Sequence, residues 1–96
     1  MHIGTLELGL TIHAAASLKD RRRTVTSLKQ RVRNRFNAAV ADLDDDPSPS
    51  YARIGIVCVA NDPRRLDAQL RSIVEFVEAL HLDLEVMHDH IDIIQL

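Results

Sequence analysis

The residues best suited to chemistry are cationic, and most of them lie in one segment, residues 17–36 ("SLKDRRRTVTSLKQRVRNRF"). This segment holds eight of the twelve Lys and Arg residues and one carboxylate, Asp20, a net charge of +7. The rest of the chain carries four cations and thirteen carboxylates, a net charge of −9. Arg binds anions through a planar guanidinium fork, and Lys binds them as a point charge. The overall charge of −2 therefore conceals a candidate anion-binding segment.

Apolar side chains recur in this segment at spacings of seven, three, four and four residues, which predicts an amphipathic helix of about five turns. Ser17 is suited to be its N-cap, with Asp20 at the third helical position. On such a helix five cations fall on one flank, over about 20 Å of surface. These are the candidate nucleic-acid-binding residues: Lys19, Arg22, Arg23, Lys29 and Arg33.

Three interpretations of these cations stay open. They could form an ordinary solvated face, since Lys and Arg are good helix formers. They could be neutralised within the chain, with Arg21 to Arg23 facing the four carboxylates that follow the second strand. They could hold a polyanion, with RNA backbone as the favoured ligand. The carboxylates in question are Asp42, Asp44, Asp45 and Asp46, and Arg21 itself is expected to extend past the end of the core.

The "HDH" stretch, His88 to His90, suggests a metal site because histidines at i and i+2 on a strand share a face. A structural zinc site needs four converging ligands. His2 and His13 lie at opposite ends of the first predicted strand, so neither is expected to reach this pair. We therefore predict no metal site and no cofactor.

No catalytic residues are predicted either. The glycines are isolated within strands, so there is no glycine-rich phosphate loop. Cys58 lies between valines and is expected to be an inert core thiol. Asp44 to Asp46 are expected to form a solvated turn. Because the chain has only three aromatic residues, we do not expect bases to stack on its sheet. We expect a protein that is not an enzyme and has no small-molecule substrate.

Other periodicities predict the elements that position this segment. Leu6, Leu8, Leu10 and Ile12 alternate, which is typical of a strand with one buried face. An Asn-Asp-Pro sequence begins a second helix whose apolar stripe runs to Leu80. The expected strands are residues 5–12, 37–43, 51–60 and 82–93, with a loop at 44–50 and a bulge around Met87 to His90.

The order strand, helix, strand, strand, helix, strand predicts an α+β, ferredoxin-like βαββαβ fold. Its four-stranded antiparallel sheet has the order 4-1-3-2, with both helices on one face. The opposite face is left bare, and the third strand is apolar on both faces. We therefore expect a homodimer formed through the sheet face.

Length and composition bear on the number of domains, the cellular setting and the presence of membrane spans. Ninety-six residues fit a single domain, residues 1–96. One cysteine cannot form an internal disulfide, which favours a reducing, cytoplasmic setting. No apolar run approaches the ~18 residues of a membrane span, so no membrane partner is expected.

Several motifs resemble the YlxP-like bacterial family, which is catalogued as a domain of unknown function. They are Ser17-Leu18-Lys19, Phe36-Asn37, and Ile54-Gly55 followed by Asn61-Asp62, and the resemblance covers essentially the whole chain. It implies a ferredoxin-like fold and no established activity. Genes of the family commonly neighbour those of transcription elongation and translation initiation factors, which implies a link to RNA or the ribosome. The acidic, Trp-containing loop of relatives is replaced here by residues 47–51, without Trp.

The sequence therefore predicts a non-enzymatic RNA- or ribosome-associated protein that contacts phosphates through its basic first helix. The alternative is a homodimeric assembly or regulatory module that binds a protein partner and no nucleic acid.

Overall fold

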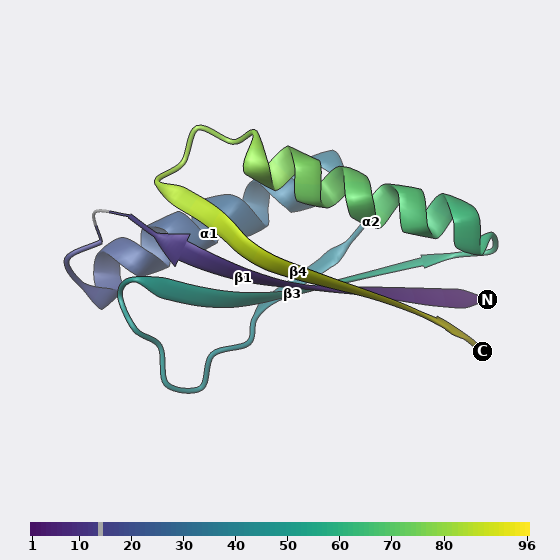
Figure 1. Cartoon of the computed structure of the whole chain (residues 1–96), viewed down its shortest axis with the longest axis horizontal. Coiled ribbons are helices and arrows are strands. Elements are labelled where there is room, and N and C mark those ends of the chain that lie inside the picture. The colour runs from purple at the N-terminus through teal and green to yellow at the C-terminus, as the bar shows by residue number, and fades with distance from the viewer. Residues whose placement is uncertain (14) are drawn as a thin grey trace.

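The computed structural model describes residues 1–13 and 15–96. Two helices lie on one face of a long, twisted sheet, and the other face of the sheet is uncovered (Figure 1). The elements are β1 (His2–Ile12), α1 (Leu18–Arg35), β2 (Ala39–Asp42), β3 (Tyr51–Ala60), α2 (Pro63–Glu78) and β4 (Leu84–Gln95).

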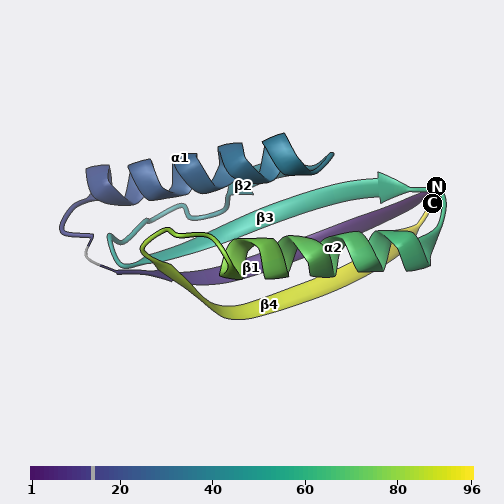
Figure 2. The same cartoon turned by 90° about the horizontal axis from the view of Figure 1, so that it is seen from above.

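The sheet has the order β2-β3-β1-β4, and each pair of neighbours is antiparallel. This confirms the predicted ferredoxin-like α+β fold and its strand order. Seen from above, α1 runs on the β2 side of the sheet and α2 on the β4 side (Figure 2). Helix α1 therefore lies over one edge of the sheet, with one flank directed outward past β2.

Alternating side chains of β1 and β3 form the floor of the core. Leu6 and Leu8 of β1 are almost fully buried, as are Ile54 and Ile56 of β3. Both helices place their apolar stripes on this floor. Gly4 allows α2 to approach closely, because a Cβ atom there would lie 2.6 Å from Leu70 Cδ1. The helix side of the core comprises Val25, Leu28 and Val32 of α1 and Leu66, Leu70, Ile73, Val74 and Val77 of α2.

The predicted helix starts are confirmed. Ser17 Oγ accepts a hydrogen bond from the Asp20 backbone N–H, and Asp20 Oδ2 accepts one from Ala16 N. Asp62 caps α2 in the same way, through a bond from Arg64 N at 2.9 Å, with Pro63 at the first helical position. These caps satisfy N–H groups that have no partner within the helix.

Three strands differ from their predicted extents. The first begins at His2, before the predicted start at residue 5. The second strand is shorter than residues 37–43, because β2 pairs with β3 only from Ala39 to Asp42. The last strand continues to Gln95, opposite His2. The predicted bulge is confirmed: the register shifts between Gly9 and Leu10 of β1, which leaves Met87 as the extra residue of β4.

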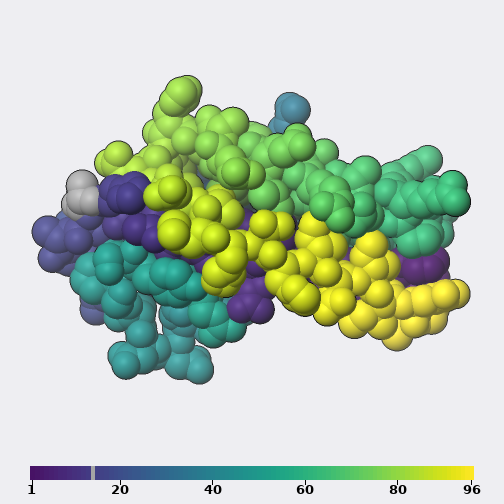
Figure 3. Space-filling model, in the orientation of Figure 1, coloured from purple at the N-terminus to yellow at the C-terminus, as the bar shows by residue number. Residues whose placement is uncertain are grey.

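Residues 43–50 join β2 to β3 and project from the sheet on the side away from the helices (Figures 1 and 3). The start of this loop lies close to α1, because β2 runs beside that helix. Neither helix in the described part of the chain is long and apolar enough to span a membrane.

Candidate anion-binding surface

Five cations of α1 form what we call the basic ridge: Lys19, Arg22, Arg23, Lys29 and Arg33. The buried side of the helix consists of Arg21, Val25, Leu28 and Val32. The ridge lies on the opposite side and on the flank toward β2. Four of its members are exposed and Lys29 is partly buried. The structure therefore presents the five sequence-predicted residues on one continuous helix surface.

Arg21 belongs to the same run of arginines, but its surroundings are different. Its side chain is only 5% exposed and makes a bidentate pair with Asp42, at 2.8 and 3.2 Å. A third bond, at 2.6 Å, joins its Nη2 to Asp44 Oδ2, and its Nε donates to the Tyr51 carbonyl oxygen. The guanidinium is thus satisfied on all sides by groups of this chain.

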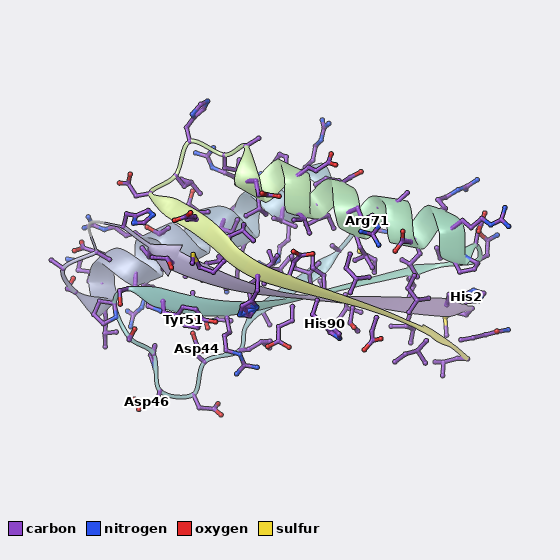
Figure 4. The ribbon with its side chains drawn as sticks, viewed as in Figure 1. His2, Asp44, Asp46, Tyr51, Arg71 and His90 are labelled. Atoms are coloured by element: carbon purple, nitrogen blue, oxygen red, sulfur yellow. The ribbon has the colours of Figure 1, made fainter. Side chains whose placement is uncertain are left out.

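The expectation that Arg21 extends past the end of the core was wrong, because two carboxylates hold it inside. Neutralisation within the chain is confirmed for Arg21 alone. Within residues 1–13 and 15–96, no ion pair joins Arg22 or Arg23 to a carboxylate. Asp44 lies near the sheet, whereas Asp46 lies at the tip of the projecting loop (Figure 4).

The Arg21 pairs also shift proton affinities. The hydrogen bonds from Arg21 lower the pKa of Asp42, and partial burial opposes this only in part. The same bonds raise the pKa of Arg21. Both partners therefore stay charged at neutral pH, and the pair fixes the start of the 43–50 loop against α1.

Arg33 has a different partner. Its Nη2 donates a hydrogen bond of 2.9 Å to the carbonyl oxygen of Val40 in β2. Leu43 N bonds to Arg53 O, so by antiparallel alternation the Val40 carbonyl points away from β3. Arg33 therefore contributes to the position of α1 over β2, as well as positive charge to the ridge.

A shallow groove of about 220 Å³ separates α1 from β2 and the start of the loop. Arg22, Thr26 and Lys29 line the helix side, and Asp42 and Pro47 line the other. Asp42 accepts hydrogen bonds from Arg21, which lower its pKa, and the positive charge of Lys29 lowers that pKa further. Asp42 therefore compensates Lys29 in part, whereas no ion pair within residues 1–13 and 15–96 joins Arg22 to a carboxylate. Two cations and a hydroxyl group on one wall suit an anionic group such as a phosphate.

The ridge is electrostatically unfavourable for the helix itself. Lys19 and Arg23 are like charges at i and i+4, as are Lys29 and Arg33. Such pairs destabilise a helix by about 0.2–0.5 kcal/mol each. Across the described residues, no ion pair offsets Lys19, Arg22, Arg23 or Lys29. A bound anion would relieve this repulsion.

The histidines of β4 lie on the open face of the sheet. His88 Nε2 is 3.1 Å from the Tyr51 hydroxyl, and His90 Nε2 is 3.4 Å from Asp92 Oδ2. Figure 4 shows His90 directed away from the helices. The described residues bring together no group of three or more His, Cys, Asp or Glu side chains able to hold a metal ion. The predicted absence of a metal site stays a prediction.

The cysteine and the aromatic residues have structural roles in the fold. Cys58 is buried, 3.4 Å from Gln69 Nε2, and burial raises the pKa of its thiol. Phe36 and Phe76 pack edge to face with ring centroids 5.5 Å apart, against the core. With Tyr51 bonded to His88, these aromatic rings are engaged with their own chain.

A family model described as "Protein of unknown function (DUF503)" matches residues 3–91. The chain belongs to the DUF503 family. It is also similar to "Uncharacterized protein YlxP" of Bacillus subtilis (strain 168), with 25% identity over 77 residues. The match covers 80% of this chain and 84% of that relative. The resemblance predicted from the sequence motifs is therefore confirmed at the level of the family.

The DUF503 match includes the whole of α1 and the start of the 43–50 loop. Sequence reasoning found the ridge through its charge and spacing. It missed the carbonyl contact of Arg33 and the choice of Asp42 and Asp44 as partners of Arg21. The signal for the second was an arginine at a core-facing helical position, which requires buried partners.

Proposed function

We propose that this DUF503 protein is a non-enzymatic, cytoplasmic RNA- or ribosome-associated protein whose basic ridge contacts the phosphate backbone. One observation carries the proposal: within residues 1–13 and 15–96, no salt bridge joins Lys19, Arg22, Arg23 or Lys29 to a carboxylate, whereas the neighbouring Arg21 has two. Arg21 fixes Asp42 and Asp44 in place. The four ridge cations, of which Lys29 is attracted by Asp42, can still bind an external anion.

The expected mode is recognition of backbone and shape. Arg22 and Lys29 lie on one wall of the groove, two helical turns or about 10 Å apart, and Thr26 lies between them. Such a wall can hold successive phosphates of one strand. Because the aromatic rings are engaged with the fold, base stacking has no platform here, and little sequence selectivity is expected.

The test is an RNA titration at two salt concentrations with the variant Arg22→Ala/Arg23→Ala/Lys29→Ala. Arg33 is left unchanged because it also bonds to Val40. Each phosphate contact contributes about 0.7 to the salt slope on single strands, so the slope should fall by about 2. The matched control is Arg64→Ala/Arg65→Ala/Arg71→Ala on α2, which changes net charge equally and should bind RNA as the parent does.

Affinity that is insensitive to salt, or equally reduced in the ridge variant and the control, would contradict the proposal. Circular dichroism of the ridge variant should show an intact fold, since the three side chains lie outside the core.

A second candidate function is a protein-interaction module without nucleic-acid affinity. The observation that favours it is the set of large apolar side chains exposed on the open sheet face, Val57, Val59 and Ile94 among them. Absence of RNA binding by the parent protein, together with self-association in solution, would favour this candidate over the first.

A further inference from the structure

The open sheet face is divided into an apolar and a polar end. Alternation places the odd-numbered residues of β1 and β3 on this face, with the registered residues of β4 and β2. The end nearest the chain termini carries Ile3, Val57, Val59 and Ile94. The other end carries ionic and hydrogen-bonding side chains.

The apolar end contains a hollow. Ala39 and Ala41 of β2 and Gly55 of β3 are small, and Leu43 and Val57 rise on either side. Together they enclose about 170 Å³ lined almost only by apolar atoms. Leu43 packs over Gly55, since a Cβ atom at position 55 would lie 3.0 Å from Leu43 Cδ2, and it forms one wall of the hollow.

Farther along β3, past Val57, one apolar side chain is highly exposed. Val59 is 58% exposed, more than Val57 at 41% and Ile94 at 50%. In β3 the hollow at Gly55 lies two residues before Val57, and Val59 lies two residues after it. Consider two sheets that face each other, with a two-fold axis between them that passes over Val57 at right angles to β3. This axis places Val59 of one copy opposite Gly55 of the other.

The polar end needs no external counter-charge. Arg53 pairs with Glu7 at 2.6 Å, Tyr51 bonds to His88, and His90 lies beside Asp92. These pairs are formed within one chain. A second copy can cover Arg53 and Glu7 without leaving either charge unpaired, and an unpaired buried charge is the main cost in such contacts.

We propose that the occupant of the open face is a second copy of this chain, packed so that Val59 of each copy fills the Ala39–Ala41–Gly55 hollow of the other. One face then supplies both the protrusion and the recess, as an isologous contact requires. The contact uses the face opposite the basic ridge, so it is independent of the RNA proposal and leaves both ridges of the dimer outward.

The strength of the proposed dimer can be estimated from its contact area. Four strands spaced about 4.8 Å apart, overlapping over about 24 Å around Val57, cover roughly 450 Å² per copy, or about 900 Å² in total. Specific interfaces generally exceed about 1,000 Å². The dimer should therefore be weak and dissociate on dilution.

Sedimentation velocity over a concentration series tests this. The parent protein should change from monomer to dimer as concentration rises. Ala41→Arg, which fills the hollow, and Val59→Asp, which removes the protrusion, should each raise the dissociation constant at least about tenfold. Both positions are exposed in the single chain, so the fold should persist. Ala68→Arg, on the exposed side of α2, is the matched control and should dimerise as the parent does.

Mixing the Ala41→Arg and Val59→Asp proteins tests the pairing itself. A heterodimer has one parental contact and one Arg–Asp pair, so the mixture should associate more tightly than either variant alone. A parent protein that stays monomeric at every concentration overturns the proposal. A dimer that persists unchanged in both variants overturns the Val59 contact, and RNA affinity measured on the same samples reports separately on the ridge.

Discussion

The basic ridge of α1 and the open face of the sheet are both exposed, but they differ in whether their charged side chains form ion pairs within the chain. On the ridge, four cations lie within about three helical turns without a salt bridge to a carboxylate among the described residues. On the open face, Arg53 and Glu7 form an ion pair at 2.6 Å, and Asp92 has a hydrogen-bonding neighbour, His90, at 3.4 Å. Charge left unpaired suits a charged partner, whereas charge paired locally suits a partner that excludes water.

Arg21 shows that the difference is a matter of position and not of residue type. It lies in the same helix as Arg22 and Arg23, one residue before the first of them. Because its position faces the core, it is buried and paired, and it uses the two nearest carboxylates. Position on the helix therefore decides which arginine of this run is buried and paired.

The largest expected effect comes from breaking the Arg21 network. Asp42→Ala/Asp44→Ala leaves a buried guanidinium without a counter-charge, and the free energy of unfolding should fall by about 3 kcal/mol. Urea titration measures this. Asp45→Ala/Asp46→Ala, in the exposed part of the same loop, is the control and should change stability little. Equal losses in both variants would show that Arg21 is not specially dependent on its two partners.

Acid should weaken the same network. Folding lowers the pKa of Asp42 below its unfolded value of about 4, so its contribution is complete above that pH. The contribution is lost as pH falls through the folded pKa. Below about pH 4 the stability difference between the parent and Asp42→Asn should therefore shrink, as urea titrations across pH would show. A difference that stays constant down to pH 2 would contradict this.

Arg33 is intermediate between the two regions, since it has a backbone partner but, in the part of the chain that the structure describes, no carboxylate partner. Arg33→Ala should lower the free energy of unfolding by about 1 kcal/mol through loss of the bond to Val40 O. Arg33→Lys keeps the charge and loses the fork. If Arg33→Lys is as unstable as Arg33→Ala but binds RNA as tightly as the parent protein, the structural and the RNA-binding roles of Arg33 are separate.

The smallest effect should have the opposite sign. Arg23→Gln relieves its repulsion with Lys19, so the free energy of unfolding should rise by about 0.3 kcal/mol while RNA affinity falls. Arg35→Gln, in the last turn where cations favour the helix dipole, should instead lower stability slightly. Thermal unfolding at low salt measures both. A loss of stability in Arg23→Gln would mean that this side chain has a favourable contact.

Much of the fold followed from local signals. The alternation of β1, the apolar spacing of α1 and the caps at Ser17 and Asp62 each depend on neighbouring residues alone. The phase change in the last strand likewise located the bulge near Met87. The five ridge positions were predictable because helix periodicity fixes which residues share a flank.

Contacts between elements were harder to predict. Four carboxylates at the end of β2 were equally plausible partners for three arginines. The choice of Asp42 and Asp44 depends on where the strand ends relative to the first turn of α1. The hollow at Ala39, Ala41 and Gly55 also requires the register of β2 with β3, which the sequence does not reveal.

The hydrogen bond from Arg33 to the Val40 carbonyl has a consequence for growth of the protein into fibres. A foreign strand that adds to β2 must take over the outward carbonyl of Val40, and Arg33 already occupies it. The last turn of α1 therefore disfavours the addition of further strands at the β2 edge of the sheet, and so opposes aggregation through this short, alanine-rich strand.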